Sequence, residues 1–172
     1  YDLVANLPYN AGTNMVLKAL CDDNCENIIV MLQLEVAKKF LASFGVSEFS
    51  ALGVISELSC VSRSEVVFVD RTSFDPSPKV DSMVIYLQKD KNLLNNKIDE
   101  KANNKVSDEV KKFLKICFLA PRKKLITSLK SKYQVSNILE IFKNLAKNEN
   151  VRSHEVSSLQ YIQMFDSLSK SG

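Results

Sequence analysis

The spacing of hydrophobic residues predicts alternating strands and helices in the N-terminal half of the chain. Residues 2–6 are a short apolar run that ends before a proline, and residues 27–32 are a longer one. Continuous apolar runs of this length are typical of buried strands in parallel sheets. Residues 12–20 and 35–42 instead show helical spacing, and Gly12, Thr13 and Asn14 offer cap chemistry to the first of these helices. The order strand, helix, strand, helix predicts an α/β sheet.

The segments that follow predict one more helix and a pair of strands. Residues 50–60 have apolar side chains at helical spacing. Residues 65–69 and 82–87 are rich in β-branched and aromatic residues, and a proline-bearing loop at 74–78 joins them. We expect these two strands to pair antiparallel at an edge of the sheet.

A change in composition predicts a domain boundary. Residues 90–105 are rich in Lys, Asn and Asp and have almost no apolar side chains, which is typical of an exposed linker. Beyond them, four segments show helical spacing: 110–119, 123–133, 137–147 and 157–168. The sequence therefore predicts an α/β domain at 1–90, a linker at 91–106 and a small all-α domain at 107–172.

Composition excludes several classes of protein. The chain has 172 residues, 45% of them hydrophobic and 25% charged, as in ordinary globular domains. No apolar run approaches the ~18 to 20 residues that a membrane span needs. We therefore expect a soluble, cytoplasmic protein with no membrane contact.

Metal chemistry is not expected from this sequence. The four cysteines match no double Cys-x-x-Cys spacing, and the only histidine is His154. Cys21 and Cys25 could pair in an oxidising compartment, but we favour buried, reduced thiols in a cytoplasmic protein.

The charge is distributed unevenly along the chain. Residues 1–106 hold 11 Lys and Arg against 14 Asp and Glu, whereas residues 107–172 hold 12 against 6. The two parts thus carry net charges of −3 and +6. A basic half beside a mildly acidic one indicates contact with a polyanion, most often nucleic acid, and an ordinary solvated lysine-rich surface is the alternative.

The tetrapeptide Asn6-Leu7-Pro8-Tyr9 carries the most chemical information. It follows a predicted strand of an α/β sheet, where open sheets bind their ligands. An adenine exocyclic amine is a weak nucleophile, and an enzyme that methylates it is expected to accept its hydrogens with the Asn6 side-chain oxygen and a backbone carbonyl fixed by Pro8. Tyr9 would then stack on the base. In the alternative interpretation, Pro8 ends a strand, Asn6 caps the next helix and Tyr9 packs.

Four stretches in the same order resemble one known family. They are residues 6–9, 31–37 and 74–82, followed by Arg122 and Lys123 with Leu125, Ser128, Leu129 and Arg152. With them the chain resembles the KsgA-type small-subunit ribosomal RNA adenine dimethyltransferases. The family's fold implies the C-terminal part of a Rossmann-like class I methyltransferase domain followed by a small all-α domain. The resemblance also implies S-adenosylmethionine as methyl donor and small-subunit ribosomal RNA, in a pre-30S-type particle, as partner.

The resemblance also implies roles for particular residues. In this family the residue at Asn6 touches the methyl donor and the target amine, the one at Tyr9 lines the base pocket, and the one at Phe74 stacks on the flipped adenine. Pro76 and Pro78 would stiffen the Phe74 loop. The expected RNA contacts are Lys79, Arg122, Lys123, Lys124, Lys130 and Arg152. For Gln33 and Glu35, strand-end and helix-start roles and ligand contact both stay open.

The chain also departs from the family pattern. Pro121-Arg122-Lys123 stands where the family usually has Arg-Arg-Lys, and Thr127 replaces an Asn, so fewer RNA contacts are expected. The family's glycine-rich donor loop and ribose-binding acidic residue lie upstream of the position of Asn6. We therefore expect a fragment that is inactive alone. The alternatives are a catalytically silent RNA-binding or ribosome-assembly module and, less favoured, a DNA adenine methyltransferase.

Overall fold

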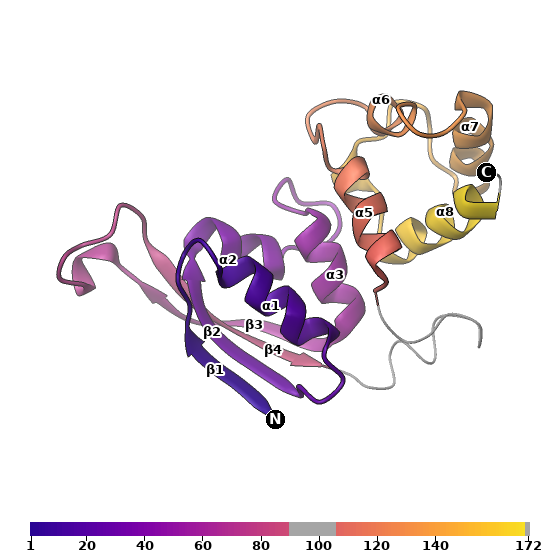
Figure 1. Cartoon of the computed structure of the whole chain (residues 1–172). Coiled ribbons are helices and arrows are strands. Elements are labelled where there is room, and N and C mark those ends of the chain that lie inside the picture. Colours follow the sequence, from indigo (N-terminus) through magenta and orange to yellow (C-terminus); the bar gives the residue numbers. More distant parts are fainter. Residues whose placement is uncertain (90–105, 171–172) are drawn as a thin grey trace. The chain divides into compact units, whose positions relative to one another are not determined.

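A computed structural model describes residues 1–89 and 106–170 of the chain (Figure 1). The chain forms two compact units. One contains residues 1–41 and the described part of 56–105, and the other contains residues 42–55 and the described part of 106–172. The expected linker at 91–106 lies outside the described residues, except for Val106.

The first unit is built on a mixed four-stranded sheet in the order β1-β2-β4-β3. Its strands are β1 (Asp2–Asn6), β2 (Asn27–Gln33), β3 (Cys60–Val69) and β4 (Ser82–Lys89). β1 and β2 are parallel, whereas β4 runs antiparallel to both β2 and β3. The α/β sheet and its antiparallel edge are thereby confirmed. β3 begins at Cys60 rather than at the expected residue 65, because two register shifts disturb the alternation that marks a strand in the sequence.

Helices cover one face of this sheet, and the strand side chains on that face are the buried ones. α1 (Gly12–Cys21) and α2 (Leu34–Leu41) lie over the same face (Figure 1). Along β2, Ile28, Val30 and Leu32 are buried, whereas the residues between them are half-buried. The apolar run of β2 is therefore buried mainly on one face, and not on both as a central parallel strand would be.

The start of α1 differs from the expected cap. The N-cap residue is Ala11, which makes no side-chain cap bond, so the cap predicted at residues 12–14 is wrong. The Pro8 carbonyl instead accepts hydrogen bonds from the N–H groups of Ala11 at 3.1 Å and Gly12 at 2.8 Å. A Cβ atom at position 12 would lie 2.9 Å from Cδ2 of Leu32. The absence of a side chain at Gly12 therefore lets the helix start pack closely against β2.

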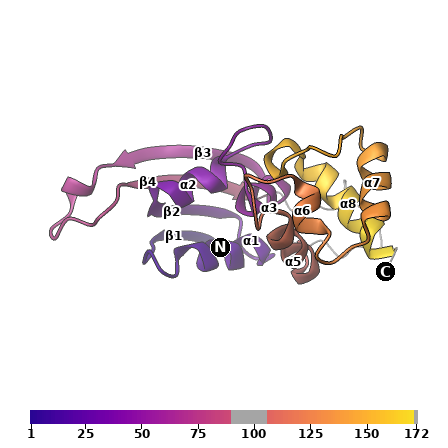
Figure 2. The ribbon, with the colours of Figure 1, turned by 90° about the horizontal axis from the view of Figure 1, so that it is seen from above.

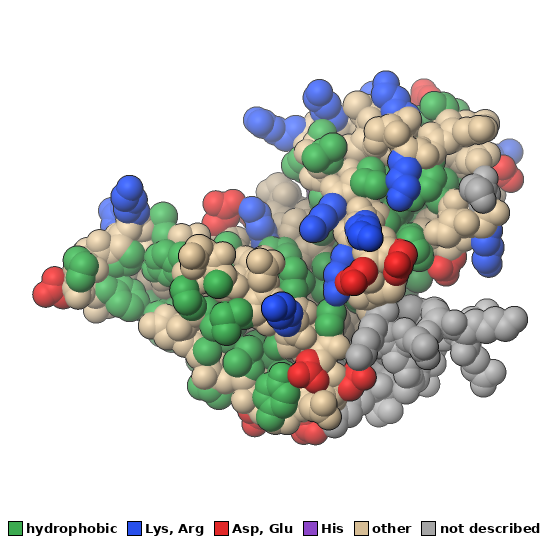
Figure 3. Space-filling view, viewed as in Figure 1, with side chains coloured by type: hydrophobic (Ala, Val, Ile, Leu, Met, Phe, Trp, Pro, Cys, Tyr) green, Lys and Arg blue, Asp and Glu red, His purple; other side chains and the backbone are tan. Residues whose placement is uncertain are grey.

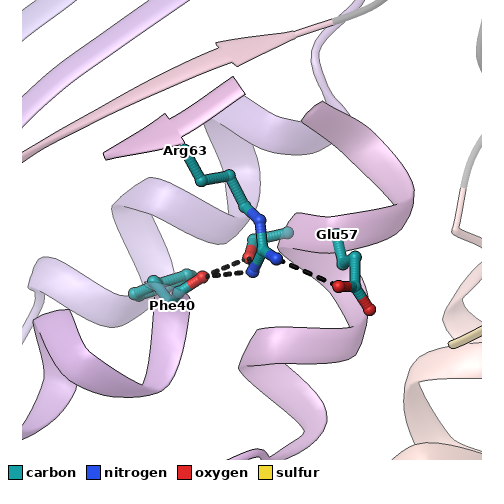
Figure 4. A network of polar contacts seen from close by, with 4 residues as sticks. Phe40, Glu57 and Arg63 are labelled. Atoms are coloured by element: carbon teal, nitrogen blue, oxygen red, sulfur yellow. Dashed lines mark hydrogen bonds and ion pairs between the residues drawn. The ribbon is translucent and has the colours of Figure 1, made fainter. Parts of the chain in front are cut away.

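Arg63 joins the edge strand β3 to two helices (Figure 4). Its guanidinium donates to the Phe40 carbonyl of α2 at 3.0 Å and to the Ser56 hydroxyl at 3.2 Å. It also forms an ion pair of 3.1 Å with Glu57, which lies with Ser56 in α3 (Ala51–Ser59). The Arg63 side chain is only 12% exposed, so these partners replace the water that burial removes.

The second unit is helical, as expected. Its helices are α5 (Asp108–Cys117), α6 (Leu125–Leu129), α7 (Val135–Asn144) and α8 (Ser158–Lys170). Its core is aromatic: the ring centre of Phe113 lies 5.5 Å from that of Phe165, 6.2 Å from Tyr133 and 6.4 Å from Tyr161. Ser107 caps α5 by accepting a hydrogen bond from the Val110 N–H at 3.2 Å.

Residues 42–55 pack with the helices of the second unit. The Phe49 ring lies edge-on to Phe118 with centroids 6.2 Å apart, and the Gly45 N–H donates to the His154 carbonyl at 2.9 Å. Lys147 Nζ lies 5.3 Å from the centre of the Phe44 ring. The sequence had put this segment within a domain at 1–90. The functional division of the chain stays a prediction, and these contacts add residues 42–55 to the helical side.

α6 is shorter than the helix expected at 123–133. Lys124 is extended and forms an isolated antiparallel bridge with Arg152, so the helix starts at Leu125. After Leu129 the Ser131 hydroxyl donates to the Ser128 carbonyl at 2.8 Å. Such local side-chain bonds compete with helix continuation, which explains the early end.

Candidate functional site

The motif segments of the first unit meet at one edge of the sheet. Because β1 and β2 are parallel, their carboxyl ends share that edge. Ser82, the first residue of β4, lies opposite Gln33, the last residue of β2, and opposite Val69, the last residue of β3. The segments 6–9, 31–37 and 74–82 therefore all begin, end or turn at the edge where α/β sheets bind ligands.

Two hydrogen-bond acceptors are available at the end of β1. Asn6 is exposed, and among the described residues its side-chain amide has no partner. Leu7 is 4% exposed, and its N–H donates to the Met31 carbonyl at 3.4 Å. The Leu7 carbonyl also has no partner in the described parts of the chain, whereas the Pro8 carbonyl is occupied at the start of α1. The Asn6 amide oxygen and the Leu7 carbonyl are thus free to accept hydrogens from an amine.

Tyr9 is fixed at one end and open along its ring. Its hydroxyl lies 2.8 Å from Oγ of Ser82, a residue with no exposed surface. The Tyr9 side chain is nevertheless 39% exposed. This exposure does not fit a purely core role, and it leaves ring surface for an aromatic ligand.

A self-bonded loop connects β3 to β4. At the start of η1 (Arg71–Ser73), an Asp70 carboxylate oxygen accepts from the Thr72 N–H at 2.8 Å and the Thr72 hydroxyl at 2.6 Å. These hydrogen bonds lower the pKa of the Asp70 carboxyl. The Arg71 carbonyl accepts from the Ser77 hydroxyl at 2.9 Å, and the Arg71 N–H donates to Asp81 at 3.0 Å. The loop therefore has a defined shape of its own.

Phe74 lies in this loop. Its side chain is half-buried and makes no ring contact with another aromatic of the described residues, Tyr9 included. The loop extends past the ends of β1 and β2 in both views (Figures 1 and 2), and its Asp75–Pro76 peptide is cis. Lys79 is exposed. The base-stacking role of Phe74 and the phosphate contact of Lys79 stay predictions.

The middle motif has structural roles at the same edge. Gln33 ends β2 and Glu35 lies in the first turn of α2, as the strand-end and helix-start interpretation expects, and ligand contact by either residue stays a prediction. Glu35 is paired with Lys39 at 2.7 Å, and this hydrogen bond lowers the pKa of its carboxyl.

The second unit carries what we call the basic surface. It consists of the exposed residues Arg122, Lys123, Lys124, Lys130 and Arg152. The bridge between Lys124 and Arg152 brings together two cations that are distant in sequence. On the face shown in Figure 3, Lys and Arg side chains gather mainly over the helical unit. The structure thus brings Lys124 and Arg152 together, and contact of the basic surface with RNA stays a prediction.

Residues 1–89 and 106–170 contain no group of three or more His, Cys, Asp or Glu side chains placed to hold a metal ion. Over the same ranges no helix is both long and apolar enough to span a bilayer. All four cysteines are free thiols. Burial raises the pKa of the Cys60 thiol to about 12 and also raises that of Cys117.

Comparison with known proteins assigns the family. A family model described as "Ribosomal RNA adenine dimethylase" matches residues 1–170. The chain belongs to this family. The resemblance drawn from the motifs is thereby confirmed over nearly the whole length of the chain.

Relatives of this chain include proteins named ribosomal RNA small subunit methyltransferase A. That of Aliarcobacter butzleri (strain RM4018) is 46% identical over 165 residues, covering 96% of this chain and 58% of the relative. That of Campylobacter jejuni (strain RM1221) is 44% identical over 168 residues, covering 98% and 59%. The chain therefore spans less than two thirds of the length of these relatives.

Solved structures support the fold. A dimethyladenosine transferase from Plasmodium falciparum matches with a TM-score of 0.76 at 23% identity, covering 99% of this chain and 67% of that one. The 23S rRNA methyltransferase ErmE matches with a TM-score of 0.59 at 20% identity, covering 98% and 65%. The Rossmann-like methyltransferase fold predicted for this member of the dimethylase family is confirmed.

One residue of the site was missed as a contributor. Ser82 was noted only as the end of a motif, but its buried hydroxyl is the partner of Tyr9. A signal was present: a serine directly precedes the apolar run of β4. A buried serine at a strand start needs a hydrogen-bond partner, but the sequence does not name it.

Proposed function

We propose that the chain serves the S-adenosylmethionine-dependent dimethylation of the exocyclic amines of adjacent adenosines in small-subunit ribosomal RNA. S-adenosylmethionine is the methyl donor of this family. The observation that carries the proposal is the pair of free acceptors, the Asn6 amide oxygen and the Leu7 carbonyl, at the end of β1. The RNA partner would be met in a pre-30S-type particle in the cytoplasm.

The two acceptors suit the chemistry of an adenine amine. Hydrogen bonds from its two N–H groups to Asn6 and Leu7 orient the nitrogen toward the donor methyl group. The adenine leaves the stack of its own strand and moves into the site. Tyr9 and Phe74 then supply aromatic faces on which it can stack. The methylated nitrogen then loses its proton to water, so a strong general base is not required.

The donor site is proposed to lie largely in the part of the family's length that this chain does not match. Asn6 is the only residue of the chain that we assign to the donor. A single hydrogen bond contributes a net ~0.5 to 1.5 kcal/mol, far below the ~8 kcal/mol of micromolar affinity. The 172 residues alone are therefore proposed to bind the donor weakly and to be inactive, which calorimetry with S-adenosylmethionine tests directly. Micromolar binding would contradict this part of the proposal.

The activity is tested by methyl transfer to small-subunit ribosomal RNA. The enzyme used is a protein that contains this chain and has the full length of its relatives. Asn6→Ala is expected to reduce dimethyladenosine formation about a hundredfold or more, because the amine loses its alignment. Asn24→Ala, in an exposed turn, is the matched control. Equal activity of the Asn6 and Asn24 variants would exclude Asn6 from the site.

A silent RNA-binding or ribosome-assembly module is the second candidate. The +6 net charge of residues 107–172 supports RNA binding whether or not catalysis occurs. RNA binding by the complete protein without any transfer of the labelled methyl group would favour it.

A further inference from the structure

A hydrogen bond joins two motif segments that are far apart in the chain. The Tyr9 hydroxyl, after β1, and the Ser82 hydroxyl, at the start of β4, lie 2.8 Å apart across 73 residues of sequence. Tyr9 is the residue proposed to line the base site, and Ser82 closes the loop that contains Phe74. The bond therefore fixes the position of one segment relative to the other.

Ser82 is a rigid partner in this bond. It has no exposed surface, and its backbone pairs with Gln33 on one side and Val69 on the other. The preceding residue is also fixed, because the Asp81 carbonyl accepts a hydrogen bond from the Leu34 N–H at 3.0 Å. The Ser82 hydroxyl thus has a defined location in the sheet.

Tyr9 is the more exposed partner in this bond. It lies in a turn and is 39% exposed, and its hydroxyl has no second partner among the described residues. A tyrosine ring in a turn has two rotatable side-chain bonds, and a hydrogen bond at its far end restricts both. Without that bond, packing alone would hold a partly exposed ring.

We propose that Ser82 is a positioning residue, whose hydroxyl sets the orientation of the Tyr9 ring against the target adenine. The role of the ring at the base rests on the proposed function, whereas the fixing of the ring by Ser82 does not. Stacking requires a ring face at a defined angle, so a rotated Tyr9 would weaken base binding without any change in the basic surface.

The chain offers variants that break this bond from both sides, and a matched control. Ser82→Ala leaves the Tyr9 hydroxyl partly open to water, whereas Tyr9→Phe keeps the ring but leaves a buried serine without a partner. Tyr86→Phe removes another tyrosine bond of 2.8 Å, from the Tyr86 hydroxyl to the Asn27 side chain. Asn27 starts β2, so this control lies at the opposite edge of the sheet.

Ring orientation is measured first, in the 172-residue chain, from the NMR scalar couplings that report χ1 of Tyr9. One χ1 rotamer is expected in the unmodified protein and in Tyr86→Phe, and averaged couplings are expected in Ser82→Ala. A single Tyr9 rotamer that persists in Ser82→Ala would overturn the proposal.

Base binding is measured next, with a short single-stranded RNA that carries two adjacent 2-aminopurines, whose fluorescence falls on stacking. Ser82→Ala and Tyr9→Phe are each expected to weaken binding about two- to tenfold, as the loss of one hydrogen bond implies. The double variant is expected to bind the RNA no more weakly than the weaker-binding of the two single variants. Ser82→Thr keeps a hydroxyl and is expected to bind as the unmodified protein does. Tyr86→Phe is also expected to match the unmodified protein.

The outcomes separate the inference from the proposed function. Equal quenching by the unmodified protein and Ser82→Ala would overturn the inference and leave base binding intact. Absence of quenching by the unmodified protein, with Tyr9 still fixed through Ser82, would contradict the proposed base site and support the positioning role alone. Additive losses in the double variant would show that the two hydroxyls act separately, which also overturns the proposal.

Discussion

Single side chains at the edge of the sheet are either held in place or free to bind. Leu7 and Ser82 are buried and bonded within the unit, whereas the Asn6 amide has no partner among the described residues and Phe74 is half-buried. Groups that carry packing and groups that we propose to contact a ligand therefore alternate along short stretches of sequence. Substitutions of the buried, bonded residues are expected to lower stability. Substitutions of the partner-free residues are expected mainly to weaken binding.

Phe74→Ala is the sharpest residue-scale test. In a protein of complete family length it is expected to reduce kcat/KM roughly ten- to a hundredfold, because stacking on an aromatic contributes ~1 to 3 kcal/mol per base. Since Phe74 is half-buried, the loss of stability should stay below the ~3 to 5 kcal/mol of a deleted core Phe.

The control for this variant is Phe44→Ala, because the Phe44 side chain is 49% exposed and lies outside the motifs. Methyl transfer and thermal unfolding are measured on both. A large stability loss in Phe74→Ala with normal specific activity would remove Phe74 from the site.

Thiol reactivity is predicted by burial. Cys21 is half-buried, whereas Cys25, Cys60 and Cys117 are buried. The thiolate is the reactive form, and a pKa of about 12 leaves Cys60 almost fully protonated at pH 8. In the native protein a disulfide reagent is expected to label Cys21 in a fast phase and the other three slowly. A fast phase that survives Cys21→Ser would contradict this assignment.

At the scale of elements, a polar network attaches the edge strand β3 to two helices. Register shifts interrupt its pairing with β4, and several of its apolar side chains are exposed, Val66 by 56%. Arg63 compensates by bonding to α2 and α3 (Figure 4). The strand is thus attached through its side chain as well as its backbone.

Arg63→Met is expected to reduce the free energy of unfolding by about 1 to 3 kcal/mol, because it removes hydrogen bonds of a largely buried guanidinium to Phe40, Ser56 and Glu57. Lys39→Met is the matched control, since it also removes one cation from an ion pair, but Lys39 is 39% exposed and its partner Glu35 is 80% exposed. Such surface pairs contribute ~0 to 1 kcal/mol. The free energy of unfolding of both variants is measured by urea denaturation. Equal losses of stability would show that the Arg63 network stabilises the protein no more than a surface ion pair does.

At the scale of the whole molecule, the two parts of the chain differ in net charge. The net charge of −3 over residues 1–106 and +6 over residues 107–172 favours RNA binding by the helical unit, where the basic surface lies. Phosphate contacts release counterions, so their number is visible in the dependence of affinity on salt.

The double variant Lys123→Glu with Lys124→Glu is expected to weaken RNA binding and to reduce the salt slope by about 0.7 for each lost contact to a single strand. Lys38→Glu with Lys39→Glu makes the same change of charge on α2, in the sheet unit, and is expected to have a smaller effect. Affinities at several salt concentrations test this. Equal effects of the two double variants would show that only total charge matters.

The sequence by itself determined the order of elements and the motifs. Apolar periodicity is a local property, so it identified the strands, the helices and the all-α second part. The tetrapeptide and the Phe74 loop were recognised for the same reason, because their residues are contiguous. Local patterns failed where long-range contacts intervene: α6 is shortened by the bridge from Arg152 to Lys124, and Gly12 serves packing against Leu32 rather than a cap.

Only the tertiary structure decided which residues lie together. The pairing of β4 between β2 and β3 puts the hydroxyl of Ser82 against Tyr9, and the packing of Phe49 on Phe118 assigns residues 42–55 to the helical unit. Such contacts depend on the burial of side chains distant in sequence, which hydrophobic spacing does not encode pair by pair. The sequence thus determined what the edge of the sheet contains, and the fold decided which of its side chains are fixed and which are free to meet a ligand.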